Sequence, residues 1–204
     1  MYKYPIIVFE GIEGSGKSFH IKNIQKHLNK NRIKYIKLRE PGGSKNSEKI
    51  RKLILNKNSK FKKLTDLFLY MAARNENFQN IINKNYKKKI ILIDRFIDST
   101  VAYQHYGMGI DKKIIVKLNN FILKNIKPSF TFLNIVSMKN LRIRLNKRPK
   151  NRYDKFNHKF YDKVQKGFVK LSKSKKNYMI VNSNKDISEN KKTIIKKINF
   201  LLSI

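Results

Sequence analysis

The sequence predicts an α/β protein in which five parallel strands form a sheet flanked by helices. Two observations support this prediction: short apolar, β-branched runs recur along the chain, and segments with helical periodicity separate them. Parallel neighbours need a crossover connection that is usually a helix, so this alternation is typical of a parallel sheet. The 204 residues contain no repeat or low-complexity linker, so we expect one domain over 1–204. The expected strands cover 5–9, 34–38, 90–93, 130–136 and 178–181.

The expected helices each carry one apolar stripe at helical spacing. In the first of them Ile21, Ile24 and Leu28 share a face. The later stripes consist of Ile50, Leu53 and Ile54; of Ile114, Ile115, Leu118 and Ile122; and of Ile194, Ile195, Ile198 and Leu202. We expect all of these side chains in the core, because amphipathic helices bury their apolar face against a sheet.

Composition excludes several kinds of protein. The chain has no cysteine, which rules out disulfides, thiolate catalysis and zinc-thiolate sites. The first residues lack the apolar stretch of a signal peptide, and no later run is long enough to span a membrane. We therefore expect a cytoplasmic protein that does not bind membranes.

The formal net charge of +35 would ordinarily suggest a nucleic-acid partner. Lysine, however, greatly outnumbers arginine and is spread almost evenly, and runs such as 87–89 and 173–176 contain no aromatic residue on which bases could stack. We interpret most of these lysines as a solvated surface and expect no specific nucleic-acid partner.

The stretch "GIEGSGKS" at 11–18 is the strongest local signal. It matches G-x-x-x-x-G-K-[ST] through Gly11, Gly16, Lys17 and Ser18, with an apolar strand before it and an amphipathic helix after it. Such a loop cradles the β-phosphate with backbone N–H groups, while its lysine bridges the β- and γ-phosphates. The residues expected to bind ATP are Gly11, Glu13, Gly14, Ser15, Gly16, Lys17 and Ser18.

Asp94 ends the apolar strand "IILID", where a Walker-B acid is expected beside the phosphate loop. We expect Ser18 and Asp94 to serve Mg²⁺. The alternative for Asp94 is a plain cap on the following helix.

Three further motifs bear on the phosphate acceptor. "LREPGG" at 38–43 places an arginine before a turn, "LFLYMAAR" at 67–74 puts Tyr70 and Arg74 on one helix face, and "DRFIDSTVAYQ" covers 94–104. An aromatic ring and a guanidinium on one face can address the same flat group. The chain also lacks the N-K-x-D sequence with which a GTPase selects guanine.

These motifs, together with "GMGID" at 107–111, occur in the order and spacing of bacterial thymidylate kinases, and the resemblance covers essentially the whole chain. The resemblance implies a P-loop nucleoside monophosphate kinase fold and a homodimer. It also implies the conversion of dTMP to dTDP with MgATP, on the way to dTTP.

The resemblance also implies roles for single residues. Arg39 and Arg95 would hold the 5′-phosphate of dTMP, a dianion that suits two guanidiniums. Tyr70 would stack on thymine, although this family usually has phenylalanine there, and Arg74 would bond the carbonyl edge of the base. The remaining dTMP-binding residues would be Glu13, Ser99, Tyr103 and Gln104. For Tyr70 and Tyr103 a purely structural place in the core is the alternative.

This family places its catalytic arginine either in the phosphate loop or in a flap, here expected at about 140–155. Gly14 occupies the loop position, so the charge must come from the flap, where Arg148 before Pro149 resembles the family's arginine best. Arg144 and Arg152 are the other candidates, and Lys17 and Arg95 complete the catalytic set. An exposed basic helix face is the alternative for the flap arginines.

Two departures from the family pattern are visible. The usual Pro-Asp and Leu-Asp around the fourth strand are Pro128-Ser129 and Leu133-Asn134 in this chain. Three other functions stay open: a kinase for another nucleoside monophosphate or a deoxynucleoside, a basic ATPase that binds nucleic acid, and a non-catalytic relative. The intact Lys17, Ser18 and Asp94 count against the last of these.

Overall fold

The computed structural model describes residues 3–147 and 151–203. Its five-stranded sheet has the order β2-β3-β1-β4-β5, and every neighbouring pair is parallel. The strands are β1 (Ile6–Glu10), β2 (Tyr35–Arg39), β3 (Ile90–Asp94), β4 (Phe130–Ile135) and β5 (Tyr178–Asn182). Each expected strand is present within one residue at either end, which confirms the predicted fold class.

Helices follow every strand. They are α1 (Lys17–Lys30), α2 (Lys45–Leu55), α3 (Lys63–Asn77), α4 (Asn83–Asn85), α5 (Ile97–Thr100), α6 (Lys112–Leu123), α7 (Met138–Asn146), α8 (His158–Lys173) and α9 (Ile187–Leu202). Two π-helical segments, η1 (Phe78–Ile82) and η2 (Val101–Gly107), continue α3 and α5, and a short 3₁₀ turn, η3 (Arg152–Lys155), precedes α8.

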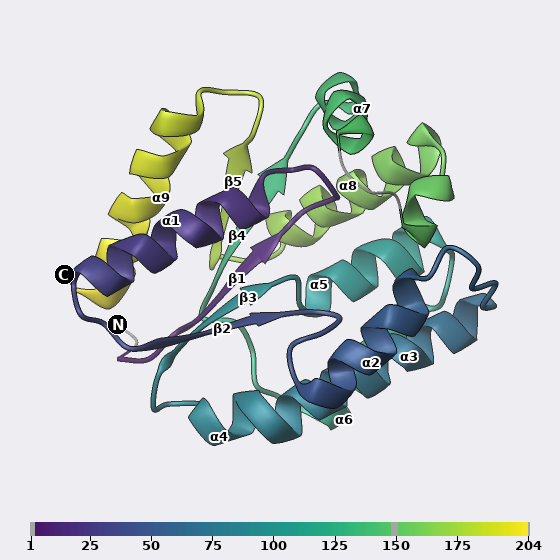
Figure 1. Ribbon diagram of the computed structural model, residues 1–204, viewed down its shortest axis with the longest axis horizontal. Helices are drawn as coiled ribbons and strands as arrows, with labels where there is room; N and C mark the ends of the chain where they lie inside the picture. The colour runs from purple at the N-terminus through teal and green to yellow at the C-terminus, as the bar shows by residue number, and fades with distance from the viewer. Residues whose placement is uncertain (1–2, 148–150, 204) are drawn as a thin grey trace.

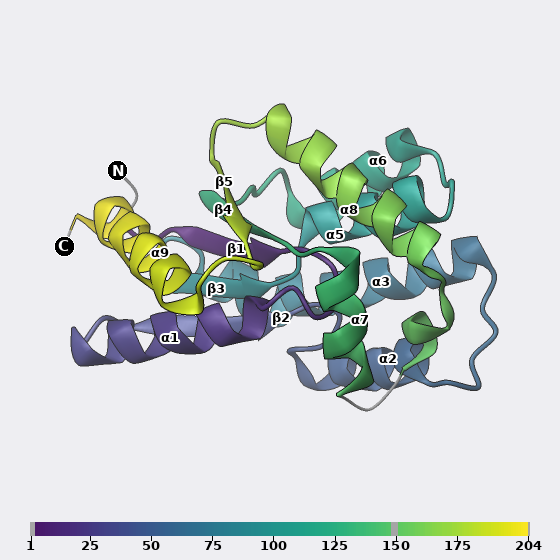
Figure 2. The same ribbon diagram turned by 90° about the horizontal axis from the view of Figure 1, so that it is seen from above.

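Helices cover both faces of the sheet. Side chains alternate along a strand, so Ile7 of β1 joins the core formed with α1 and α9, whereas Val8 joins the core formed with η1 and α6. Figures 1 and 2 show α1 and α9 side by side on the first face. The three central strands β1, β3 and β4 are therefore buried on both sides, which explains why they are almost continuous apolar runs.

The carboxyl ends of the strands gather the segments that carry chemistry. The phosphate loop follows β1, while Arg39 and Asp94 are the last residues of β2 and β3. Figure 1 shows α2, α3, α5 and α7 around this edge of the sheet. Parallel strands bring their ends to one edge, so motifs far apart in sequence meet there.

Two side chains expected in the core are exposed, and those predictions were wrong. Leu53 of α2 is 52% exposed and Ile114 of α6 is 45% exposed, whereas their neighbours Ile54 and Ile115 are fully buried. An apolar stripe on a helix is wider than the strip that touches the core, so residues at its margin can face outward. Within the described residues, the helices are too short or too polar to cross a membrane.

Candidate active site

The phosphate loop is built on backbone conformations that require glycine. Gly11 has φ +135°, and a Cβ on it would lie 2.2 Å from the backbone oxygen of Asn134. Gly16 has φ +88° and is the N-cap of α1. Side chains are strained in this region of φ, so the two fixed glycines of the motif are explained by conformation. The loop thereby opens onto the amino end of α1, where helix N–H groups favour anions.

Lys17 lies within this loop and is only 6% exposed. Its Nζ donates to the backbone oxygens of Gly11 at 2.9 Å and Ile12 at 2.8 Å. Burial lowers the pKa of Lys17 to about 8, and the nearby positive charge of Arg95 acts in the same direction. The lysine is thus held at the loop by neutral oxygens.

The side chains of Ser18 and Asp94 lie next to each other beside the phosphate loop. The Oγ of Ser18 donates to Oδ2 of Asp94 at 3.3 Å, while Oδ1 of Asp94 is buried and has no hydrogen-bond partner. The described part of the chain contains no cluster of three or more His, Asp or Glu side chains that could hold a metal alone. A hydroxyl and one carboxylate fit Mg²⁺, which takes few protein ligands and completes its shell with water and substrate phosphates.

A cavity of about 230 Å³ extends from the phosphate loop between α2, α3 and the start of η2. Seven of the eight residues expected to bind the acceptor line it: Glu13, Tyr70, Arg74, Arg95, Ser99, Tyr103 and Gln104. The lining also includes Glu40, Arg51, Thr100 and Asn151, which the sequence analysis missed. Arg39, the eighth expected residue, is not part of the lining.

Arg95 is fixed at the junction between loop and cavity. It has φ +66°, a strained conformation for an arginine, and its guanidinium donates to Glu13 Oε1 at 2.9 Å and to the backbone oxygen of Gly11 at 2.8 Å. The Tyr103 hydroxyl donates to the other oxygen of Glu13. Burial raises the pKa of Glu13, but Arg95 and Lys17 outweigh burial, so this pKa lies below its ordinary value.

Glu10 stabilises the turn that carries Arg95. The carboxylate accepts the backbone N–H groups of Phe96 at 2.9 Å and Ser99 at 3.1 Å, and also the hydroxyl of Ser99. Burial raises the pKa of Glu10 to about 7, and the charge of Asp98 adds to the effect. Three donors on one buried acid compensate for the strained backbone of Arg95 next to them.

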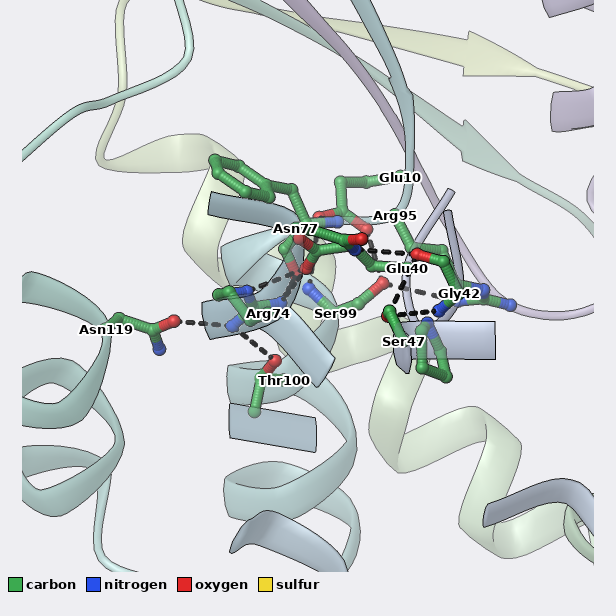
Figure 3. A network of polar contacts seen from close by, with 12 residues as sticks. Glu10, Glu40, Gly42, Ser47, Arg74, Asn77, Arg95, Ser99, Thr100 and Asn119 are labelled. Carbon is green, nitrogen blue, oxygen red and sulfur yellow. Dashed lines mark hydrogen bonds and ion pairs between the residues drawn. The ribbon is translucent and has the colours of Figure 1, made fainter. Parts of the chain in front are cut away.

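Arg74 is 2% exposed and lies at the centre of the network in Figure 3. It forms an ion pair with Glu40, in which Nε lies 2.7 Å and Nη2 2.6 Å from Oε2. Its other N–H groups bond the hydroxyl of Thr100, the amide oxygen of Asn119 and the backbone oxygen of Phe96. A guanidinium has five N–H donors, and four of them form hydrogen bonds to protein oxygens here. Arg74 thus ties α3 to α6 and to the start of α5.

Arg39 lies outside the cavity that the resemblance implied for it, whereas Arg51, which had no predicted role, lies in the lining. The Arg39 side chain is 51% exposed and binds Glu48 through both carboxylate oxygens. Arg51, from α2, lines the cavity and donates only to the backbone oxygen of Pro41, at 2.6 Å. The scarcity of arginine beside lysine was the one available signal for Arg51, since its place on α2 depends on how that helix packs.

The three arginines that were catalytic candidates in the flap differ in what they contact. Arg144 of α7 donates to the backbone oxygens of Gly14 at 2.9 Å and Ser183 at 2.8 Å, so it bridges the phosphate loop and the segment after β5. Arg152 forms an ion pair with the buried Asp66 and lines neither cavity beside the phosphate loop. The prediction for Arg148 falls outside the described residues.

A second cavity, of about 450 Å³, lies on the other side of the phosphate loop. It shares Gly14, Lys17 and Ser18 with the first, so the two meet at the loop. The rest of its lining is Ser15, Gly16, Phe19, His20, Arg144, Ser183, Lys185, Ile187 and Asn190.

The two departures around β4 have structural substitutes. Ser129 accepts the N–H of Ile6 through its hydroxyl at 3.1 Å. The buried amide of Asn134 donates to Ser183 at 3.5 Å, while its Oδ1 has no partner. A neutral residue therefore occupies each position where the resemblance implied an acid.

Comparison with known proteins places this geometry in a family. A model of the family described as thymidylate kinase matches residues 9–194. A thymidylate kinase of Sulfurihydrogenibium sp. (strain YO3AOP1) is 38% identical over 93% of this chain and 94% of its own length, and one of Clostridium novyi (strain NT) is 40% identical over 84% and 86%. The crystal structure of a thymidylate kinase from Ehrlichia chaffeensis, 32% identical, covers 96% of this chain and 98% of that chain with a TM-score of 0.77. The chain belongs to the thymidylate kinase family.

Proposed function

We propose that the protein transfers the γ-phosphoryl group of ATP to the 5′-phosphate of dTMP, forming ADP and dTDP. One observation carries this proposal: the phosphate loop separates two cavities that share Lys17 and Ser18. A phosphoryl group held on the loop is thus accessible from both sides. Family membership supports the same reaction, because the relatives are named thymidylate kinases.

The donor occupies the larger cavity in this proposal. The amides of the loop and the start of α1 bind its phosphates, and Lys17 neutralises the β- and γ-phosphates. Arg144, held between Gly14 and Ser183, lies where the donor leaves the loop. We keep Arg148 as a candidate for the charge at the transferring group, on the sequence argument alone.

Ser18 and Asp94 would hold Mg²⁺. The partnerless Oδ1 of Asp94 supports this, because a buried carboxylate oxygen needs a cation or a hydrogen bond. When bound, the ion supplies positive charge that shields the phosphate oxygens and lowers the cost of bringing two phosphates together.

The acceptor phosphate lies between Arg95 and Arg51 in the smaller cavity. Both arginines line it, and Arg51 forms no ion pair among the described residues, although the charge of Glu48 acts on it, so its guanidinium is available to the phosphate. We propose Arg51 for the part that the resemblance gave to Arg39, because Arg39 binds Glu48 and does not line the cavity.

The base of dTMP stacks on Tyr70, deeper in the same cavity. Arg74 is buried and donates four hydrogen bonds to protein oxygens, so we propose that it orients Thr100 and that Gln104 bonds the base. A carboxamide offers one donor and one acceptor edge, which matches the carbonyl and the N3–H of thymine. Tyr103 and Glu13 close the sugar side.

Transfer then needs little covalent chemistry from the protein. An oxygen of the dTMP phosphate attacks the γ-phosphorus in line, and the bond from this phosphorus to the β,γ-bridging oxygen breaks as ADP leaves. The attacking oxygen is already anionic at neutral pH, so no strong base is required. Positioning by Arg95 and charge neutralisation by Lys17 supply most of the rate.

We also propose that the protein forms a homodimer through α3 and α6, which contact each other. Their outer faces carry large apolar side chains: Leu64, Phe68, Ile114 and Phe121, of which Phe121 is 85% exposed. Light scattering coupled to gel filtration tests this proposal. A Phe121→Lys variant that runs at the mass of the unaltered protein would contradict it.

The deciding experiment measures ADP release with MgATP and each of dTMP, dUMP, dCMP, dGMP and dAMP, at two salt concentrations. Turnover with dTMP well above the others is expected. Activity that appears only with DNA or RNA, or none with dTMP, would limit the family likeness to the fold. The same assay with deoxynucleosides, which lack the 5′-phosphate, tests the alternative that the protein is a deoxynucleoside kinase.

A further inference from the structure

A buried carboxylate joins three segments on the acceptor side, and no motif points to it. Asp66 of α3 is 2% exposed. One of its oxygens forms an ion pair with Arg152 of η3, and the other accepts the hydroxyl of Tyr153 at 2.7 Å. The partners lie 86 and 87 positions further along the chain, so Asp66 fastens η3 to α3.

The same carboxylate reaches the acceptor cavity. Gln104, which lines the cavity, places its Nε2 3.5 Å from Oδ2 of Asp66. The ring of Tyr153 packs edge-on against Tyr70 at 6.4 Å and against Tyr103 at 5.8 Å. Three lining residues therefore touch Asp66 or the tyrosine that it holds.

Residue 151 completes this wall. Asn151 lines the cavity and is fixed by its own turn, because its side chain accepts the N–H of Tyr153 at 2.8 Å and Asp154 accepts the N–H of Asn151 at 2.6 Å. This turn is attached to α3 by the next residue, Arg152, whose guanidinium forms the ion pair with Asp66. Lys155 of the same turn donates to the backbone oxygen of Lys57 at 2.8 Å, but the ion pair of Arg152 with Asp66 is the buried attachment to α3.

Arg152 itself is placed for this role. Its guanidinium lies over the rings of Phe61 at 5.5 Å and Tyr153 at 5.2 Å, and its side chain is 11% exposed. Arginine surrounded in this way by an acid and two rings is held by several contacts at once.

We propose that Asp66 is a positioning residue for the reaction proposed above: through Arg152 and Tyr153 it fastens residues 151–155 to α3, and so fixes Asn151, Tyr70 and Gln104 as one wall of the acceptor pocket. The inference rests on the proposed function. It gives Arg152 a positioning part in binding dTMP, in place of a part in the transfer step.

The test is a double-mutant cycle on KM for dTMP, KM for ATP and kcat. Asp66→Asn keeps the shape of the side chain and an acceptor for Tyr153 but removes the charge that holds Arg152. We expect Asp66→Asn and Arg152→Gln each to raise KM for dTMP about tenfold, with KM for ATP changed less than about twofold. Because the two residues act as a pair, the double variant should be within about twofold of the worse single variant.

Two further variants provide a second test of the contact and a control. Tyr153→Phe removes one hydroxyl and should raise KM for dTMP by a smaller factor, and it carries the test with Arg152→Gln if Asp66→Asn does not fold. The matched control is Asp162→Asn on α8, a partly exposed acid that pairs with Lys166 at 2.7 Å; this change should leave all three constants unchanged.

Two results would overturn the inference. One is a large loss of kcat in Arg152→Gln that Asp66→Asn does not share, which would return Arg152 to the transfer step. The other is Asp66→Asn with unaltered KM for dTMP.

A readout without activity separates this inference from the proposed function. Hydrogen exchange of the amides of 151–156 should speed up in Asp66→Asn and remain unaltered in Asp162→Asn. If exchange is faster in Asp66→Asn but the unaltered protein does not turn over dTMP, then Asp66 does hold residues 151–155 in place and the proposed reaction is wrong. Unaltered exchange would reject the fastening itself.

Discussion

The two sides of the phosphate loop treat positive charge differently. On the acceptor side, Arg74, Arg95 and Arg152 each form an ion pair with an acid, namely Glu40, Glu13 and Asp66. On the donor side, Lys17 and Arg144 donate to backbone oxygens, and neither has an acidic partner within the described ranges.

This difference follows from what each side is proposed to bind. A triphosphate brings its own negative charge, so cations that face it gain most when no protein acid competes for them. A pyrimidine base is neutral, and a buried cation beside it must be compensated by the protein. Two arginines on the acceptor side are proposed to meet the acceptor phosphate: Arg51, which bonds only a carbonyl, and Arg95, which keeps Glu13 as its partner.

Removing a compensated arginine should cost the most stability. Arg74→Leu leaves Glu40 buried without its cation, and we expect the free energy of unfolding to fall by about 3 to 5 kcal/mol. Urea denaturation followed by circular dichroism measures this change. The matched variant Arg51→Leu, which breaks no ion pair, should lose about 1 kcal/mol or less. Equal losses in the two variants would remove the distinction between them.

Truncation of Arg95 should have the largest effect on the reaction. Arg95→Ala removes a guanidinium from the junction of the two cavities and leaves Glu13 unpaired there. We expect kcat/KM for dTMP to fall by about 10²- to 10³-fold, measured by coupled ADP release. Arg32→Ala, an exposed change distant from both cavities, is the control. Retention of activity in Arg95→Ala would contradict the assignment of the acceptor phosphate.

His20, which lines the donor cavity, should make the stability of the protein depend on pH. Burial lowers the pKa of His20 to about 4, and its Nδ1 has no partner. Between pH 6.5 and 4 the unfolded chain binds a proton that the folded protein does not. The free energy of unfolding should therefore decrease as the pH is lowered from 6.5 to 4, and His20 should account for on the order of 3 kcal/mol of this decrease.

The pH prediction is checked by denaturation at pH 7 and pH 4.5. His20→Leu should lose less stability on acidification than the unaltered protein, whereas His158→Leu, at an exposed position, should behave like the unaltered protein. The same pH dependence in all three proteins would show that His20 does not contribute.

The smallest effect is expected from Arg144→Ala. Its two bonds go to backbone oxygens at the edge of the donor cavity, so we expect KM for ATP to rise about tenfold with a stability change of about 1 kcal/mol. Arg142→Ala, exposed on the same helix, is the control. A rise in KM for dTMP with no change for ATP would place Arg144 on the wrong side of the loop.

Much of the site could be predicted because its motifs are contiguous. Gly11 and Gly16 are dictated by the local backbone, and Lys17, Ser18 and Asp94 follow from their place at strand ends. The neighbouring parallel strands β1 and β3 deliver these segments to one edge of the sheet, so correct prediction of the strands also places the motifs near one another.

The partners of the arginines could not be predicted in the same way. By sequence, Arg152 is a candidate for the transfer step or part of an exposed basic face, yet it meets an acid 86 positions earlier in the chain. Arg39 and Arg51 lie on neighbouring elements, and only the packing of α2 decides that Arg51 lines the cavity while Arg39 binds Glu48.

By itself, the sequence determined the parallel sheet, the phosphate loop and the identity of most residues around the acceptor cavity. The sheet and the phosphate loop depend on apolar periodicity and local backbone geometry, which are properties of short stretches of chain. The acceptor residues were expected because their motifs occur in the order and spacing of a known family. The tertiary structure alone decided which charges are paired and which remain available. Ion pairs between distant segments depend on distances of a few ångströms, and the packing of whole helices sets those distances.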